Sequence, residues 1–202
     1  MLPALILAAG ASTRMGSPKA LLPAPDGRPF AARIVRSLIS AGLHPIVVVT
    51  GAVHEAIVAA IDADAPPERP RFARNPDPSR GQLSSLWVGM DAVVDAGTEG
   101  MLVTLVDVPL VAVSTIEAVV DAWRQTRAPI VRPAIGDRHG HPVIFDRAVF
   151  SALRGAPGEG GAKIVVHAYE GQLVNVPVDD EGCLVDVDTR RDYEELTRGR
   201  RV

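Results

Sequence analysis

Apolar runs and helix-like repeats alternate along the first part of the chain. Residues 4–9 form an uninterrupted apolar run that ends at Gly10, which is typical of a buried parallel strand. Residues 30–41 repeat apolar side chains at helical spacing, and Gly42 follows where a helix would end. Residues 45–50 are a second apolar run, rich in valine. These segments predict a strand, a helix and another strand.

The alternation continues and then becomes less regular. The pattern predicts helices at residues 53–61, 82–96 and 114–125, strands at residues 71–73 and 101–106, shorter strands at residues 130–132, 142–145 and 173–178, and a last helix that ends near residue 197. Ser114 and Glu117 match a capping box for the helix predicted from residue 114. Thr189 is placed to cap the last helix.

Repeated strand–helix–strand units predict a Rossmann-like α/β fold, which is a mostly parallel sheet with helices on both faces. Residues 132–178 break the alternation, and they predict a small, partly antiparallel lobe. No repeat and no shift in composition marks a boundary, so residues 1–202 are predicted to form a single domain. Ligands in such sheets bind beyond the carboxyl ends of the strands, so the loops at those ends are the first place to look for chemistry.

Composition narrows the class of protein. Aromatic residues make up only 4% of the chain, so the core must be built from the aliphatic side chains that fill parallel sheets. The formal net charge of -3 argues against a nucleic-acid partner and means that an anionic ligand must be met by local donors. A single cysteine, Cys183, excludes an intrachain disulfide. No signal peptide and no membrane-spanning run is found, so we expect a soluble, cytoplasmic protein without a membrane partner.

The loop after the first predicted strand carries small residues and two cations. Its small side chains let the backbone approach a ligand, and successive N–H groups can surround an anion. Arg14 offers a planar fork for phosphate oxygens, and Lys19 offers a point charge. The spacing fits neither a Walker A motif nor a Rossmann fingerprint. From composition alone, a solvated loop with two incidental cations remains an alternative.

The loop resembles the signature Leu-Ala-Ala-Gly-x-Ser-x-Arg-Met-Gly-x-x-Lys of the MobA-like NTP transferases, the nucleotidyltransferases related to the molybdenum-cofactor enzymes. The resemblance extends over almost the whole chain. It implies the nucleotide-diphospho-sugar transferase type of Rossmann-like fold, with the loop wrapped around a triphosphate. The nucleotide-binding residues implied here are Leu7, Ala8, Ala9, Gly10, Arg14 and Lys19.

Three aspartates are candidates for a metal site. Asp107 directly follows the strand predicted at residues 101–106, and one or two carboxylates together with phosphates suffice for Mg²⁺. Asp186 and Asp188 lie on one face if their segment is extended. A turn at Asp107 and helix capping at Asp188 or Thr189 are the structural alternatives. The resemblance implies that Asp107 holds magnesium together with Asp186 and Asp188, of which either can be the direct ligand, and that Arg14, Lys19 and Asp107 are catalytic.

Further candidates lie near the start of the helix predicted at residues 82–96. The segment that begins at Gly81 and contains Ser84 and Ser85 resembles a family element that lies against the nucleotide, although these serines are also suited to capping their own helix. Gly51 and Asn75 occupy positions that resemble the same pocket. The resemblance therefore implies nucleotide contacts for these five residues.

Two later segments are candidates for contact with the second substrate. Gly140-His141-Pro142 resembles a segment of the cytidylyltransferase branch, which makes His141 a candidate, although histidines in turns are usually structural. Lys163, in a segment that begins at Glu159, stands where the family has arginine. Gly140-His141-Pro142 and Ala8-Ala9 both resemble the cytidylyl branch more than the guanylyl branch. The resemblance therefore implies CTP rather than GTP as the nucleotide.

The resemblance implies that CMP is moved from CTP to the terminal phosphate of molybdopterin, a phosphorylated pterin, with Mg²⁺ as cofactor and pyrophosphate as product. A phosphate monoester is largely dianionic at neutral pH, so no general base is needed. A molybdoenzyme or its chaperone is an implied further partner. The alternatives are another small nucleotidyltransferase that acts on methylerythritol phosphate, phospholactate or a sugar phosphate, and a nucleotide-binding chaperone without turnover.

Overall fold

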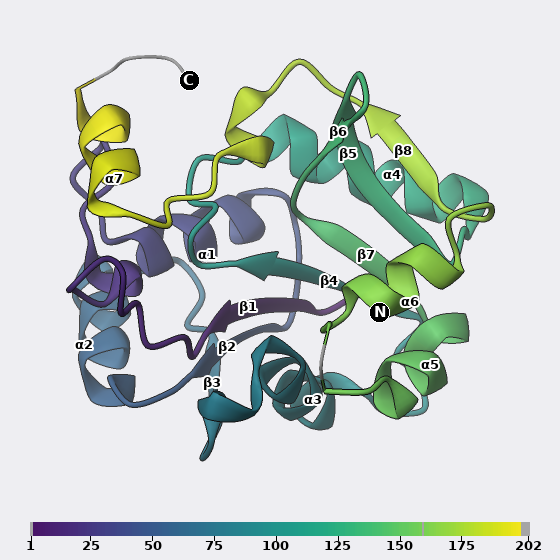
Figure 1. Ribbon diagram of the computed structural model, residues 1–202, viewed down its shortest axis with the longest axis horizontal. Helices are drawn as coiled ribbons and strands as arrows, with labels where there is room; N and C mark the ends of the chain where they lie inside the picture. Colours follow the sequence, from purple (N-terminus) through teal and green to yellow (C-terminus); the bar gives the residue numbers. More distant parts are fainter. Residues whose placement is uncertain (1, 159, 199–202) are drawn as a thin grey trace.

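The computed structural model describes residues 2–158 and 160–198, so Glu159 lies outside the described part (Figure 1). The strands are β1 (Ala4–Ala8), β2 (Ile46–Thr50), β3 (Arg71–Arg74), β4 (Gly100–Leu105), β5 (Ile130–Ile135), β6 (Arg138–His139), β7 (Val143–Asp146) and β8 (Val174–Pro177). The helices are α1 (Phe30–Ser40), α2 (His54–Asp64), α3 (Gln82–Val93), α4 (Val113–Thr126), α5 (Phe150–Gly155), α6 (Lys163–Ala168) and α7 (Arg190–Thr197), joined by short 3₁₀ turns.

The strands of the described part form one eight-stranded sheet in the order β3-β2-β1-β4-β7-β5-β6, with β8 paired to β5. Strands β3, β2, β1 and β4 are parallel, and β7 runs antiparallel to both β4 and β5. The predicted mostly parallel α/β fold is confirmed. The antiparallel strands predicted for a small lobe extend this same sheet.

Helices cover both faces of the sheet, as Figure 1 shows. One core lies between the sheet and helices α1, α2, α4 and α7, and it takes Ile6 and Val48 from the central strands. The other lies against α3, α5 and α6, and it takes Leu5 and Val47. Alternate residues of β1 and β2 thus enter opposite cores, and each fully buried aliphatic side chain stabilises the fold by about 1.5–3 kcal/mol.

The two predicted helix caps have different outcomes. Thr189 caps α7, because its side chain accepts a hydrogen bond from the Asp192 N–H (3.3 Å) while Asp192 accepts one from the Thr189 N–H (2.7 Å). The capping box predicted at Ser114 is wrong, since α4 begins one residue earlier, after Ala112. Asp180, remote in sequence, accepts the Ala112 N–H at 2.8 Å and takes the place of a local cap.

Helices α5 and α6 and strand β6 were not predicted. Each helix has six residues and β6 has two, too few for a periodic pattern to be recognised. Among the described helices, none is long and apolar enough to span a lipid bilayer. The parallel strands β1 and β4 end at the same edge of the sheet, and this brings the loop after β1 close to Asp107.

Candidate active site

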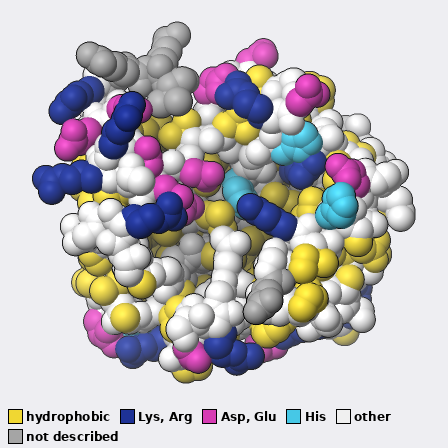
Figure 2. Space-filling view, in the orientation of Figure 1, with side chains coloured by type: hydrophobic (Ala, Val, Ile, Leu, Met, Phe, Trp, Pro, Cys, Tyr) yellow, Lys and Arg dark blue, Asp and Glu magenta, His cyan; other side chains and the backbone are white. Residues whose placement is uncertain are grey.

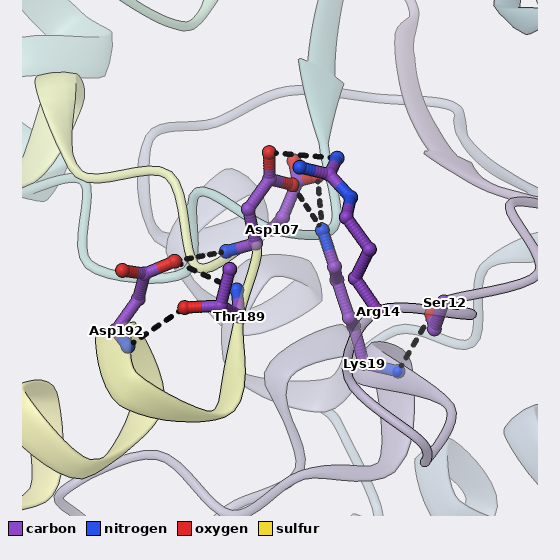
Figure 3. Close-up of polar contacts among 7 residues, drawn as sticks. Ser12, Arg14, Lys19, Asp107, Thr189 and Asp192 are labelled. Atoms are coloured by element: carbon purple, nitrogen blue, oxygen red, sulfur yellow. Dashed lines mark hydrogen bonds and ion pairs between the residues drawn. The ribbon is translucent and has the colours of Figure 1, made fainter.

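The loop between β1 and residue 19 folds back on itself, so that its two cations face the edge of the sheet. Ser12 has a left-handed φ of 51°, and its carbonyl accepts hydrogen bonds from the N–H groups of Met15 and Gly16. The Ser12 hydroxyl also accepts the Lys19 N–H at 3.1 Å. Gly16 has a φ of 71°, a conformation that favours glycine. The Lys19 side chain extends from this turn beside that of Arg14, towards Asp107 (Figure 3).

Three distant segments of the chain meet in one ion-pair network (Figure 3). Lys19 Nζ lies 3.0 Å from Asp107 Oδ2 and 2.6 Å from Asp188 Oδ1. Arg14 Nη2 lies 3.0 Å from the second Asp188 oxygen. The Lys19 side chain is only 11% exposed, whereas that of Arg14 is 70% exposed. The structure therefore brings both predicted cations to two of the three predicted carboxylates.

The network raises the pKa of Lys19 and lowers that of Asp188, so both shifts favour the charged form. Partial burial acts to lower the pKa of Lys19, but its hydrogen bonds and charge interactions with Asp188 and Asp107 raise it overall. The hydrogen bond from Lys19 holds the pKa of Asp188 below its ordinary value, against the opposing effect of burial. The charged forms of Lys19 and Asp188 therefore compensate each other.

The segment that carries Asp186 and Asp188 is fixed beside Asp107. The Val187 N–H donates to the Asp107 carbonyl at 2.9 Å, and the Val187 side chain is fully buried. The flanking aspartates therefore both point away from the core, as the extended pattern predicted. Burial of its carboxyl group in the cavity, followed by the charges of Asp107 and Asp188, raises the pKa of Asp186. An added cation would relieve this repulsion.

One carboxylate oxygen has chemistry that suits a metal ion. Asp107 Oδ1 is buried and has no hydrogen-bond partner among the described residues. No group of three or more His, Cys, Asp or Glu in the described part is arranged to hold a metal ion. Mg²⁺ commonly binds through one or two carboxylates and completes its shell with substrate phosphates and waters. The donor set present here fits an ion that arrives with a nucleotide.

Two cavities meet at Asp107. The smaller, of about 230 Å³, lies against the loop after β1, and the larger, of about 620 Å³, extends towards β5, β7 and α6. Figure 2 shows the hollowed face, where hydrophobic side chains are visible inside a border of charged ones. Residues that line both cavities are Leu7, Gln82, Leu105, Asp107 and Asp188. A group in one cavity is therefore adjacent to a group in the other.

The predicted nucleotide-binding residues fall into two sets. Those that line the smaller cavity are Leu7, Ala9, Gly10, Arg14, Lys19, Gly81 and Ser85. The others, Ala8, Gly51, Asn75 and Ser84, lie outside its lining. A Cβ atom on Gly51 would lie 2.5 Å from the Ala9 carbonyl oxygen, so this glycine permits close backbone approach. Ala8 is buried in the core.

Asn75 and Ser84 form a buried polar brace behind the wall of the smaller cavity. The Asn75 amide donates to the hydroxyl oxygens of Ser84 (2.9 Å) and Ser85 (3.0 Å), and the Ser84 hydroxyl donates to the Gly81 carbonyl (2.7 Å). Their polar groups are thus occupied within the protein. Gly81 has a φ of 90° and turns the chain into α3. The structure thus places Asn75 and Ser84 behind the residues that line the cavity, and their predicted contact with the nucleotide stays a prediction.

The larger cavity has an apolar floor and a polar rim. Its apolar lining comprises Leu7, Leu83, Leu86, Val103, Leu105, Val143, Phe145, Ala162, Val166, Leu173 and Leu184, and its rim includes Arg132, His139, Lys163, His167 and Glu170. The predicted second-substrate residues His141 and Lys163 both line it. Arg132 and Gln82 were not singled out from the sequence, although Gln82 stands beside Gly81 in a motif that was recognised.

Comparisons with known proteins agree with this geometry. Residues 4–173 match the family described as "MobA-like NTP transferase domain". Nicotine blue oxidoreductase of Paenarthrobacter nicotinovorans is 31% identical over 192 residues, which cover 92% of this chain and 91% of that protein. A probable molybdenum cofactor guanylyltransferase of Mycobacterium avium is 27% identical and covers 97% of this chain and 95% of its own length.

Solved structures with a similar fold also include proteins related to this chain in sequence. Rv0371c from Mycobacterium tuberculosis H37Rv superposes with a TM-score of 0.79 at 28% identity, covering 98% of this chain and 97% of the other. A complex of that protein with manganese superposes with a TM-score of 0.76 at 27% identity, covering 98% of each chain. From the matched family model and the full-length relatives, we conclude that this chain is a nucleotidyltransferase of the MobA-like NTP transferase family.

Proposed function

We propose that this enzyme transfers CMP from CTP to the terminal phosphate of molybdopterin or molybdenum cofactor and releases pyrophosphate. The observation that carries the proposal is the position of Asp107 at the junction of two cavities. One cavity presents the cations suited to a triphosphate, and the other presents an apolar floor suited to a planar heterocycle. A reaction between two bound substrates requires such a junction.

The triphosphate is proposed to lie along the loop after β1. Arg14 is exposed and its guanidinium can turn from Asp188 to phosphate oxygens, which it binds with a matching fork. Lys19 is held more firmly, at the inner end of the loop, and neutralises charge near Asp107. A Mg²⁺ ion that arrives with the nucleotide would be held by Asp107 and by either Asp186 or Asp188, and it would neutralise the charge that develops on the reacting phosphates.

The acceptor is proposed to occupy the larger cavity and to present its phosphate at Asp107. Its dianionic phosphate is already a nucleophile at neutral pH, so it requires positioning rather than deprotonation. Lys163 and Arg132 supply positive charge at the rim, and the apolar floor excludes water from one face of a ring. Catalysis then rests on alignment and charge compensation.

The choice of CTP is supported by two sequence features, Ala8-Ala9 at the end of β1 and Gly140-His141-Pro142, of which Gly140 and His141 line the larger cavity. The relative from Mycobacterium avium carries the name of a guanylyltransferase, so the base must be tested directly. We expect pyrophosphate release with CTP, phosphorylated pterin and Mg²⁺ to exceed that with GTP, ATP or UTP by at least about tenfold, a difference of about 1.4 kcal/mol in transition-state binding.

The same screen separates the competing functions. A preference for GTP would overturn the assignment of the base, and turnover only with methylerythritol phosphate, phospholactate or a sugar phosphate would overturn the acceptor. Binding of nucleotide and pterin without pyrophosphate release would favour a cofactor chaperone. One relative carries the name nicotine blue oxidoreductase, so turnover of nicotine blue without pyrophosphate release would indicate redox chemistry instead.

A further inference from the structure

Strand β5 presents a charged side chain to the larger cavity. Of the strand residues in the described part that line this cavity, only Arg132 is a lysine, an arginine or a carboxylate. Ile130 belongs to the core beneath α3, α5 and α6, whereas Val131 belongs to the opposite core. Because alternate residues of a strand share a face, Arg132 lies on the same side of the sheet as Ile130. The rim of the cavity thus holds a cation that the sheet itself positions.

The Arg132 guanidinium is oriented by a neighbouring strand. In the parallel pairing of β5 with β8, Arg132 stands opposite Asn175, and Arg132 Nε donates to Asn175 Oδ1 at 2.9 Å. The described residues give this side chain no ion pair and no second hydrogen bond. A guanidinium carries its N–H donors in a fixed planar fork. With Nε occupied, the two terminal nitrogens of Arg132 remain available to a ligand.

Arg132 differs from the two cations of the loop after β1, which have carboxylates at close range. Burial lowers the pKa of Arg132, and the charge of Glu170 only partly opposes this effect. Glu170 Oε2 instead lies 3.2 Å from His167 Nδ1. The partly buried guanidinium therefore has no close acidic partner within the described part of the chain. A strong hydrogen-bond acceptor on a ligand would compensate its charge.

Arg132 and Asp107 line separate parts of the larger cavity. Asp107 follows the carboxyl end of β4, whereas β5 is separated from β4 by β7. Two strand spacings correspond to about 10 Å. Lys163 is closer to the carboxylates, since its charge acts on Asp186. A ligand with its phosphate at Asp107 can therefore extend its remote end to Arg132.

We propose that Arg132 binds the carbonyl edge of the acceptor's heterocycle, at the end of the acceptor remote from its phosphate. This inference rests on the proposed function, because it takes the larger cavity as the acceptor site. The ring carbonyl and the neighbouring nitrogen of an aromatic pterin present two acceptors side by side, as guanine does, and arginine binds that pair with two N–H groups. Arg132 in this role selects the ring, whereas Arg14, Lys19 and Asp107 act on the phosphates.

A pair of fluorescent pteridines isolates this contact. Both carry a phosphate monoester, and in the second an amino group replaces the ring carbonyl. We expect the wild-type protein to bind the carbonyl form about tenfold more tightly than the amino form, because a site built to bond a polar group rejects an analogue that cannot make the bond. Arg132→Met should bind the two forms with equal affinity. Arg132→Lys retains the charge without the fork, so its preference for the carbonyl form should be less than about threefold.

Arg124→Met is the matched control, because Arg124 pairs with Asp121 on α4 and lines neither cavity. It should keep the wild-type preference for the carbonyl form. Failure of the wild-type protein to bind either pteridine overturns the acceptor assignment, and the role of Arg132 with it. Equal affinity of the wild-type protein for the two forms overturns the role of Arg132 alone.

The variants also distinguish the ring from the phosphate as the group that Arg132 binds. If Arg132→Met lost the same factor of affinity for both pteridines, the guanidinium would act on the phosphate that they share, and the proposal would be wrong. Thermal unfolding shows whether each variant keeps the wild-type fold. Should Arg132→Met fail to fold, Arg132→Lys decides the question, since an undiminished preference for the carbonyl form in that variant would contradict recognition by the fork.

Discussion

The two cavities that meet at Asp107 differ in how their polar groups are satisfied. On the loop side, Lys19 and Arg14 are paired with Asp107 and Asp188 before any ligand binds. On the other side, His141 Nδ1 and Asp107 Oδ1 are buried and unpaired within the described part of the chain. The first cavity is held in shape by its own ion pairs, whereas the wall of the second keeps two buried polar atoms without a hydrogen-bond partner. The difference separates a wall whose charges compensate one another from a wall with unused hydrogen-bonding capacity.

Substitution of Asp107 should have the largest effect, because this residue belongs to both cavities. We expect Asp107→Asn to lower the rate of pyrophosphate release by about 10²–10³-fold or more, since a charge that stabilises the transition state is lost. The rate is measured at saturating nucleotide and acceptor, so that weaker binding does not obscure the loss of chemistry.

Asp91→Asn is the matched control for this substitution, because Asp91 is exposed and pairs with Arg154 away from both cavities. Its rate should equal that of the wild-type protein. The far-ultraviolet circular dichroism of all three proteins should agree. A wild-type rate in Asp107→Asn would remove this carboxylate from the mechanism and leave the two cavities without a common centre.

The parallel part of this site was predictable from sequence for a physical reason. Long apolar runs followed by a glycine or an aspartate specify buried strands and the loops at their ends, so the loop that carries Lys19 and the place of Asp107 at the sheet edge were predictable. That the two residues belong to one site was implied by the family resemblance. The larger cavity was less predictable, since its wall comes from short elements such as α6 and from β7, whose antiparallel pairing has no local signature. The roles of Asn75 and Gly51 were also hidden, because a sequence does not show which partner occupies an amide or how closely two backbones approach.

The two cations of the loop offer the next comparison, since both pair with Asp188 at different exposure. Lys19→Met should destabilise the protein by about 2 kcal/mol, because Asp107 and Asp188 then lose the nearly buried cation that lies between them. Arg14→Met should cost less than about 1 kcal/mol, as exposed ion pairs contribute little. Urea unfolding of the ligand-free protein measures both free energies.

The KM for the nucleotide should rank the Arg14 and Lys19 variants in a different order from their free energies of unfolding. Arg14→Met is expected to raise the KM for the nucleotide despite its small effect on unfolding, since its guanidinium is free to move to phosphate. Arg28→Met serves as control, because Arg28 pairs with acidic side chains away from both cavities. Equal unfolding free energies for the Lys19 and Arg14 variants would contradict the division between a structural and a ligand-binding cation.

The brace behind the smaller cavity should show a smaller effect on stability. Asn75→Ala removes the donor shared by Ser84 and Ser85 and leaves both buried hydroxyl oxygens without it, so we expect a loss of about 1–2 kcal/mol. The KM for the nucleotide should change less than it does in Arg14→Met. If the nucleotide KM rose more than in that variant with no change in unfolding free energy, Asn75 would be a ligand contact.

The smallest effect is expected at Asp186, and its sign is informative. Burial and the charges of Asp107 and Asp188 raise the pKa of Asp186 in the folded protein. Above the ordinary carboxyl range the group ionises more readily in the unfolded chain, so a rising pH lowers the stability of the fold through this residue. At neutral pH and without metal, Asp186→Asn should therefore raise the Tm, by no more than about 2 °C for a chain of this size. Asp188→Asn should lower the Tm, because the pKa of Asp188 is lowered by its hydrogen bond with Lys19.

Addition of Mg²⁺ and nucleotide should stabilise the wild-type protein more than the Asp186→Asn variant and so reduce or reverse the difference in Tm. Thermal shifts of the same sign in both metal-free variants would show that the two aspartates do not stand in opposite electrostatic environments.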